Sequence, residues 1–291
     1  MHEQYPISYF PLSNLPERLR EIADPPEGLW IRGTLPDPSR PTLTVVGSRK
    51  YTPYGKDACE SLIAGLAGTN VVIVSGLALG IDGIAHQAAI TAGLTTIAVP
   101  GSGLSDSVVY PRSHVGLARH ILESGGALVS EFAPDFRATA WSFPQRNRIM
   151  AGLSHAVLVV EARERSGTLI TSSLASEYNR DVFAVPGDIF REGSKGPNML
   201  IALGATPIRH SDDLRDALGI PRSVAKTTAS ACSENLSSEE RSILELVREP
   251  IEIETLIERL KLSPATVTVL LVRLELAGLI ATDSGIVRRT Q

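Results

Sequence analysis

Short apolar runs alternate with helix-length segments through the middle of the chain. Runs that are apolar throughout, and not at every second position, indicate parallel strands covered on both faces. Between them lie segments long enough for helices, such as 55–66, 81–92 and 169–178. This alternation predicts an α/β domain with a doubly wound, mostly parallel sheet. The predicted strands span residues 43–47, 71–76, 95–101, 127–131, 156–162, 181–187 and 205–208.

The pattern differs at the two ends of the chain. Residues 1–41 contain eight prolines and one short helical candidate at 17–23, which predicts a lead-in that packs on the main domain, 42–219. Residues 220–235 are small, polar and aperiodic, as expected of a linker. From 236 to 291 helical periodicity returns.

This last segment begins with a helix-capping pattern at Ser237 and Glu240, which predicts a helix to about residue 247. Further helices are predicted at 254–260 and 265–277, followed by a hairpin that turns at 283–285. Three helices and a hairpin predict a small C-terminal winged-helix domain at 236–291.

Composition excludes several classes of protein. Hydrophobic residues make up 43% of the 291 residues, which excludes wholesale disorder. Only two cysteines occur, and neither they nor the six histidines have metal-ligand spacing, so no disulfide framework or metal site is predicted. The first ten residues lack the pattern of a signal peptide, and no apolar run approaches the roughly 20 residues that span a bilayer. We therefore expect a cytoplasmic protein with no membrane partner.

The first candidate for chemistry is the turn Gly47-Ser48-Arg49, which follows the first apolar run. Backbone N–H groups at a strand-to-helix turn favour an anion, and the forked guanidinium of an arginine suits a phosphate. A tight turn with an exposed arginine explains the same residues equally well. The turn matches neither GxGxxG nor a Walker loop, so no dinucleotide, ATP or other cofactor is predicted.

A second glycine-rich turn follows the next predicted strand. Ser75, Gly76 and Gly80 allow the backbone to approach a ligand closely. Asp82 and His86 lie four residues apart and can act as an acid–base pair, but helix capping by Asp82 is the simpler interpretation. No nucleophile is placed to complete a catalytic set.

The segment 141–148 combines aromatic and basic residues: Trp141 and Phe143 stand beside Arg146, Asn147 and Arg148. Arginines neutralise phosphates and aromatic rings stack on unpaired bases, which together describe a single-strand binding surface. Core aromatics with ion-paired arginines explain the pattern too. The segment leads into a helix predicted at 149–153.

Two further segments complete the candidates. Ser166, Gly167 and Thr168 open a predicted helix, where hydroxyl and N–H groups can hold a phosphate or simply cap the helix. Apolar residues at Met199, Ile201 and Leu203 form either a dimer surface or part of an ordinary core helix.

Taken together, seven segments of the chain resemble the DNA-processing protein A (DprA, or Smf) family. They follow one another in the family's order over nearly the whole chain, and the lead-in and the winged helix are similar as well. Many members carry a further helical domain before the lead-in, whereas this chain begins almost at the lead-in. The segments are GSR, SGLALGID, PGSGL with YPR, SEF, FPQRNRIMAGLS, VVEARERSGTLIT and VFAVPGD.

The resemblance implies a Rossmann-like domain that binds single-stranded DNA without sequence preference and is not an enzyme. It implies a role in natural transformation and DNA recombination, in which incoming strands are protected and the RecA recombinase is loaded onto them, and a homodimer formed through the Rossmann-like domain. The family's DNA groove maps to Arg49, Phe143, Arg146 and Arg148. The winged helix varies within the family, and its third helix here carries only Arg273 beside Glu275, which is poor equipment for reading a major groove.

Two other functions are compatible with this scaffold. A nucleotide phosphoribohydrolase of the lysine-decarboxylase-like group shares a glycine-threonine phosphate loop, here Gly167 and Thr168 with Glu177 beyond, although the PGGxGT run of that group is absent. A transcription factor would read duplex DNA through the winged helix and use the large domain as a sensor.

Net charge bears on where DNA can bind. The chain carries 28 Lys and Arg against 32 Asp and Glu, a net charge of −4. The window 137–165 nevertheless contains five Arg against two Glu. Because the local field of a cleft governs contact with a ligand, the acidic total predicts a confined DNA site and weak binding to duplex elsewhere.

Overall fold

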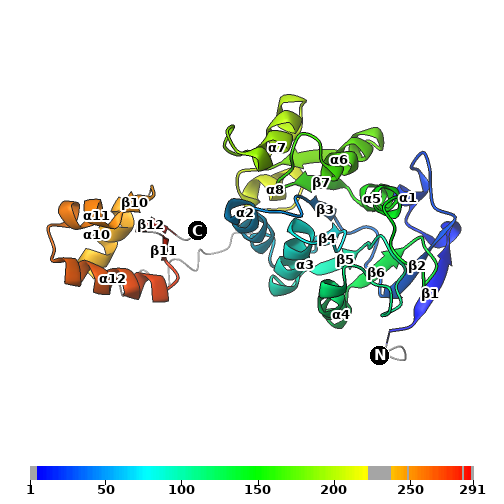
Figure 1. Ribbon diagram of the computed structural model, residues 1–291, viewed down its shortest axis with the longest axis horizontal. Coiled ribbons are helices and arrows are strands. Elements are labelled where there is room, and N and C mark those ends of the chain that lie inside the picture. The colour runs from blue at the N-terminus through cyan, green and yellow to red at the C-terminus, as the bar shows by residue number, and fades with distance from the viewer. Residues whose placement is uncertain (1–4, 222–236, 248, 284, 290–291) are drawn as a thin grey trace. The chain divides into compact units, whose positions relative to one another are not determined.

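The computed structural model describes residues 5–221, 237–247, 249–283 and 285–289 (Figure 1). The chain divides into two compact units, Met1–Arg222 and Ser223–Gln291. Most of the predicted linker 220–235 lies outside the described residues. Among the described residues, no helix combines the length and apolar character needed to cross a bilayer.

The first unit is built on a nine-stranded sheet in the order β1-β2-β6-β5-β4-β3-β7-β8-β9. All seven strands from β3 to β9 are parallel to one another. Strands β1 and β2 form one edge of the sheet, where β1 pairs antiparallel with β2 and β2 pairs antiparallel with β6. The predicted α/β class and mostly parallel sheet are thus confirmed. The strands are β1 (Ile7–Pro11), β2 (Gly28–Gly33), β3 (Thr42–Val46), β4 (Val72–Ser75), β5 (Thr95–Ala98), β6 (Ala127–Ser130), β7 (Ala156–Val159), β8 (Asp181–Ala184) and β9 (Thr206–Pro207).

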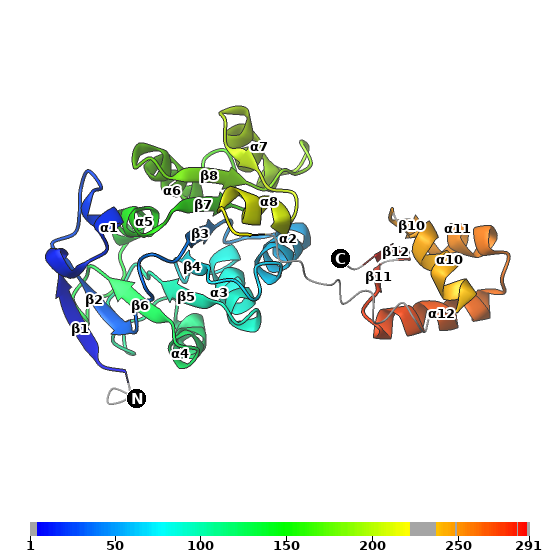
Figure 2. The same cartoon turned by 180° about the vertical axis from the view of Figure 1, so that it is seen from behind.

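Helices cover both faces of this sheet because apolar side chains leave each central strand in both directions. In β3, Val46 packs on one face with residues of α5 and α6, while Leu43 and Val45 pack on the other with α2 and α3. Figures 1 and 2 show α2 beside α3 on the same side of the sheet. The helices are α1 (Glu17–Arg20), α2 (Pro53–Ala64), α3 (Ile81–Thr91), α4 (Val115–Glu123), α5 (Ser142–Leu153), α6 (Gly167–Glu177), α7 (Glu192–Ala202) and α8 (Ser211–Ala217).

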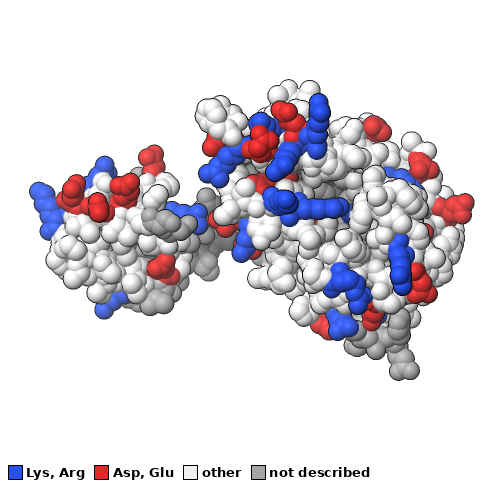
Figure 3. Space-filling view, viewed as in Figure 1, with Lys and Arg blue, Asp and Glu red and all other residues white. Residues whose placement is uncertain are grey.

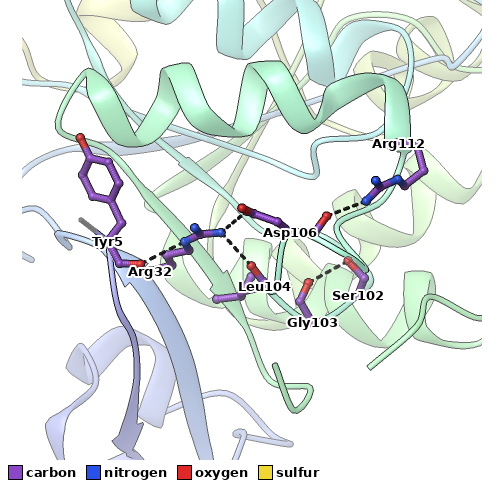
Figure 4. A network of polar contacts seen from close by, with 7 residues as sticks. All are labelled: Tyr5, Arg32, Ser102, Gly103, Leu104, Asp106 and Arg112. Carbon is purple, nitrogen blue, oxygen red and sulfur yellow. Dashed lines mark hydrogen bonds and ion pairs between the residues drawn. The ribbon is translucent and has the colours of Figure 1, made fainter. Parts of the chain in front are cut away.

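The N-terminal segment is part of the sheet and not only a lead-in that packs on it. Strand β2 joins the sheet by pairing with β6, and β1 pairs with β2. Arg32 of β2 is almost fully buried and crosses from this edge to the loop after β5 (Figure 4). Its Nε donates to the Tyr5 carbonyl at 3.1 Å, and its Nη1 donates to the Leu104 carbonyl at 3.2 Å and to Asp106 at 2.5 Å. The segment therefore helps to hold the loop that follows β5.

The second unit contains α10 (Ser238–Leu246), α11 (Ile253–Leu260) and α12 (Pro264–Leu276), with a small sheet of β10 (Ile251–Glu252), β12 (Ile286–Arg289) and β11 (Ile280–Asp283). The capping box predicted before the first helix is present: the Ser237 hydroxyl accepts from the Glu240 N–H at 3.2 Å, and the Glu240 carboxylate accepts from the Ser237 N–H at 2.8 Å. An apolar core that includes Leu256, Val267 and Val287 holds the unit together. The predicted winged-helix architecture is confirmed.

Candidate nucleic-acid interface

A pocket lies where the chain changes direction across the sheet. From β3 the strands proceed through β4 and β5 to β6, and the chain then returns to place β7 on the other side of β3. The loops after β3 and β7 therefore leave the sheet toward opposite faces and open a crevice between them, which is where ligands bind in doubly wound sheets. The structure has a pocket of about 640 Å³ there, lined by the loops after both strands and by the start of α5.

One wall of the pocket is the turn after β3. The Ser48 hydroxyl donates to the Lys50 carbonyl at 2.8 Å and accepts from the Lys50 N–H at 3.1 Å, which closes a tight turn. Arg49 and Lys50 are both exposed and both line the pocket. The turn thus presents two neighbouring cations to the cavity.

The glycine-rich turn after β4 supports that wall from behind. Gly80 has a φ of +84°, and a side chain there would overlap the Ser48 carbonyl oxygen and the Arg49 backbone. Ser75 is buried and its hydroxyl donates to the Val45 carbonyl at 2.7 Å. None of Ser75, Gly76 and Gly80 lines the pocket. Gly80 therefore allows the two turns to pack closely together, a contact within the protein rather than with a ligand.

The floor is formed by the start of α5, which begins at Ser142, seven residues before the predicted helix start. Phe143 lines the pocket, with the Arg49 guanidinium carbon 5.2 Å from its ring centroid. The Tyr110 ring packs against Phe143 at 5.7 Å between centroids, in a tilted arrangement. Arg49 and Phe143 thus form one cation–aromatic pair at the mouth of the crevice.

Arg146 is at the pocket but is buried. Its Nη1 donates to the Gly76 carbonyl at 2.5 Å and to the Val99 carbonyl, and its Nε donates to the Asn147 side chain at 3.2 Å. Burial lowers the pKa of Arg146 from 12.5 to about 10, an effect that the nearby Asp82 carboxylate opposes. Burial likewise raises the pKa of Asp82, against the opposing effect of Arg146. This arginine joins the ends of β4 and β5 beneath the pocket.

Arg148 lies outside the pocket lining. Its guanidinium pairs with the Glu131 carboxylate and lies 3.4 Å from the Asp24 carboxylate, and it also donates to the Asp24 carbonyl at 2.7 Å. Its side chain is only 10% exposed. These contacts with Glu131 and Asp24 tie α5 to the end of β6 and to the segment after α1.

The opposite wall is the segment between β7 and α6. The Ser166 hydroxyl caps α6 by accepting from the Thr168 N–H at 3.2 Å, and the Thr168 hydroxyl reaches across to donate to the Gly47 carbonyl at 3.1 Å. Gly167 opens the helix at the pocket, where the helix dipole favours an anion. Arg163 and Arg165 are exposed on this segment and line the same pocket.

A buried carboxylate fixes the two walls relative to each other. Glu161, just after β7, accepts from the Thr52 N–H at 2.9 Å and from the Thr52 hydroxyl at 2.5 Å. Thr52 caps α2, the helix that follows the cationic turn after β3. The loops that carry the cations of both walls are therefore joined below the pocket.

The electrostatic character of the pocket is cationic. Of the described residues that line it, only Asp82 is acidic, and Asp82 is buried beside Arg146. None of the ion pairs found among the described residues involves the four exposed cations at the rim. These cations are Arg49, Lys50, Arg163 and Arg165.

The structure brings together most of the predicted binding residues and adds others. The predicted residues that line the pocket are Gly47, Ser48, Arg49, Phe143, Arg146, Asn147, Ser166, Gly167 and Thr168. Lys50 was not among the predicted binding residues, although its position next to Arg49 was a signal in the sequence. Arg163 and Arg165 contributed only to the predicted local charge.

Comparison with known proteins agrees with this fold. The model of the DNA recombination-mediator protein A family matches residues 8–219, and that of the DprA winged helix domain matches residues 225–285. The chain belongs to this family. Protein Smf of Escherichia coli (strain K12) is 39% identical over 276 residues, which cover 93% of this chain and 73% of that protein. DNA processing protein DprA of Bacillus subtilis (strain 168) is 41% identical over 216 residues, 73% of this chain and 71% of that protein.

Two solved structures of family members resemble this fold. DprA from Streptococcus pneumoniae has a TM-score of 0.67 and 40% sequence identity, and the match covers 72% of this chain and 74% of that chain. DNA processing protein A from Helicobacter pylori has a TM-score of 0.65 and 31% identity, covering 73% of this chain and 96% of that chain. That structure is described as giving insight into a single-stranded DNA binding mode of the Helicobacter pylori protein.

Proposed function

We propose that this DprA-family chain binds single-stranded DNA, without sequence preference, in the pocket at the switch point of the sheet. The observation that carries this proposal is the rim of four exposed cations on two facing loops, one of which leads into the start of α6. Figure 3 shows Lys and Arg side chains gathered on this side of the larger unit, with acidic side chains among them. A strand of phosphates fits a cationic crevice of this kind, and the likeness to the Helicobacter pylori protein supports the assignment.

The geometry favours an unpaired strand over a duplex. The crevice is a pocket between two loops, and the single aromatic ring on its floor, Phe143, offers a surface for one base. Backbone phosphates are held by cations that carry no sequence information. Sequence-independent binding follows from this division between phosphate and base contacts.

Binding of a fluorescent oligo-dT and of a matched duplex, each measured over a salt series, tests the proposal. We expect tighter binding of the single strand and a log–log salt slope of about −0.7 for each phosphate contact. Equal affinity for both DNAs, or binding that does not respond to salt, contradicts it. Incubation with AMP is the matched test of the phosphoribohydrolase alternative, for which we expect no release of adenine.

We further propose that the protein acts on incoming single strands in natural transformation, where it shields them and helps to load RecA. This follows from family membership together with a site suited to an unpaired strand. The direct measurement is RecA filament formation on strands coated by a single-strand binding protein, with and without this chain. We expect faster filament formation with it, and an unchanged rate contradicts the loading role.

A homodimer formed through α7 is the remaining part of the proposed function. Met199 is 37% exposed and Leu203 is 77% exposed, and they lie four residues apart at the end of the helix. Leu200 of the same helix packs on the core, so the exposed pair lies on a different side, with Ile201 partly buried beside it. Light scattering of Leu203→Glu should show a folded monomer, and an unchanged dimer moves the interface elsewhere.

A further inference from the structure

Trp141 is an exposed aromatic side chain with no role in the pocket. It is 55% exposed and does not line the cavity, although Ala140 before it and Phe143 after it both do. Side chains two residues apart at a helix start point in different directions, so Trp141 and Phe143 lie on different sides of the α5 N-terminus. The indole is thus next to the pocket but outside it.

The ring is held firmly from below. Phe132 and Phe136 stack on each other at 4.5 Å between centroids, and Trp141 packs edge-on against them at 5.6 and 5.7 Å. Phe132 is buried, so the pair anchors the indole to the body of the protein. A large apolar ring that is both exposed and rigid suits a ligand that stacks, because little side-chain entropy is lost on binding.

A cation for a phosphate lies close by in the sequence. Arg137, four residues before Trp141, is exposed, whereas Arg146 and Arg148 are buried in contacts within the protein. Ala140, next to Trp141 in the sequence, lines the cationic pocket. At the pocket, by contrast, the Phe143 ring is already contacted by Arg49 and Tyr110. A strand that leaves the pocket past Ala140 therefore meets a freer aromatic ring at Trp141.

We propose that Trp141 is a second base-stacking position, where an unpaired base of a strand that leaves the pocket stacks on the indole while Arg137 faces its phosphate. This inference rests on the proposed single-strand binding at the pocket and extends the path of the strand across the start of α5. The ligand class is an unpaired nucleobase in a strand longer than the pocket holds.

Intrinsic fluorescence gives a direct test because the chain contains only two tryptophans, Trp30 and Trp141. In the full-length Trp30→Phe variant, emission reports Trp141 alone. Stacking of a base quenches the indole, so we expect saturable quenching with an oligo-dT of about 16 nucleotides and little with one of about 4. Fluorescence anisotropy of labelled DNA measures binding in parallel.

Substitution provides the second arm. Trp141→Ala should weaken binding of the longer oligo-dT about tenfold, since one base–aromatic stack is lost, and leave the shorter one unchanged. Trp141→Phe should retain most of the affinity, and thermal unfolding verifies that both variants fold. Phe190→Ala, which removes another exposed ring outside the pocket lining, is the matched control and should not alter binding.

The outcomes separate the two proposals. The longer oligo-dT can bind by anisotropy while Trp141 emission and the affinity of the Trp141→Ala variant stay unchanged. In that case the stacking assignment is overturned and single-strand binding stands. The exposed indole would then be a candidate contact for a protein partner. If neither oligo-dT binds, both proposals fail. If Trp141→Phe loses as much affinity as Trp141→Ala, stacking by an aromatic ring is not the reason for the loss.

Discussion

The pocket of the first unit and the exposed face of α12 in the second differ in the charges that they present. The pocket has four exposed cations on its rim and one buried acid. On α12, the helix that a winged helix can place in a major groove, Val269 is 56% exposed and Val272 is 48% exposed, and Arg273 has Glu275 near it. The architecture of a winged helix is therefore present in one unit, while the exposed cations suited to phosphates lie in the other, so the site and not the fold decides where we propose that DNA binds.

The largest expected effect comes from Arg146, which separates the structural arginines of the pocket from those proposed to bind DNA. Arg146→Ala removes the donor of two buried carbonyls and takes away the stronger of the two cationic influences on the buried Asp82, leaving only that of Arg49. We expect the free energy of unfolding to fall by about 3–5 kcal/mol. Arg273→Ala on α12 is the control, with a change below about 0.5 kcal/mol. Denaturant unfolding checks this, and similar losses in both variants contradict the assigned role of Arg146.

Next in size is the loss of rim cations. Arg49→Ala combined with Arg165→Ala should lower the affinity for oligo-dT about 100-fold, because two charge-assisted contacts are removed. The salt slope should become shallower by about 1.4. Both side chains are exposed, so stability should be unchanged. Arg273→Ala is again the control, measured by anisotropy; if it weakens binding as much as the double variant, the contrast between the two surfaces fails.

Acid should destabilise the first unit selectively, because all six histidines precede residue 222. Burial lowers the pKa of His86 to about 3 and that of His155 to about 4. Unfolded histidine titrates near 6.5, so the unfolded state binds more protons as pH falls below this value, and stability is lost progressively down to about pH 4 for His155 and about pH 3 for His86. Melting curves should show that the transition temperature of the first unit is lower at pH 5 than at pH 7, and that it falls more than the transition temperature of the second unit.

The control for acid sensitivity is the variant His155→Gln, which removes one of these protonation sites. In this variant, the melting temperature of the first unit should differ less between pH 7 and pH 5 than it does in the unaltered protein. Equal acid sensitivity in both units excludes the histidines as its cause.

The smallest effects concern the helix caps. The Ser166 hydroxyl caps α6 at the pocket and the Ser263 hydroxyl caps α12, each by accepting an N–H bond. Replacing either serine by alanine should cost about 1 kcal/mol of stability. Only Ser166→Ala should also weaken oligo-dT binding, since it alters the helix start at the pocket. A loss of binding in Ser263→Ala instead would place DNA on α12.

The sequence predicted the central sheet well because continuous apolar strands have few other interpretations. It missed β1 and β2, which lie in proline-rich surroundings. No residue of β1 is buried, and in β2 the buried Ile31 is followed by Arg32, a charged residue that is also buried, so neither strand has a period-2 pattern. It also placed the start of α5 too late, because Pro144 looks like a helix breaker although proline is tolerated in a first turn.

The sequence predicted most of the residues that line the candidate site, but not which of its arginines are exposed and which are buried. Arg49 and Arg146 were both predicted to bind DNA, yet one is exposed at the rim and the other is buried against carbonyl groups. Arg148 pairs with Glu131, which lies 17 positions away in the sequence. No local sequence pattern predicts such a pair. Which arginine is exposed depends on long-range packing, and composition carries no information about it.

The bond between Glu161 and Thr52 has a consequence for the ligand-free protein. It joins two loops that carry like charges on facing sides of a crevice, and the bond from the Thr168 hydroxyl to the Gly47 carbonyl joins them a second time. Because like charges repel one another, these bonds hold the loops together against the repulsion between their cations. A bound polyanion would reduce that repulsion, and the gain in thermal stability on binding should be greatest at low ionic strength, where the repulsion is screened least.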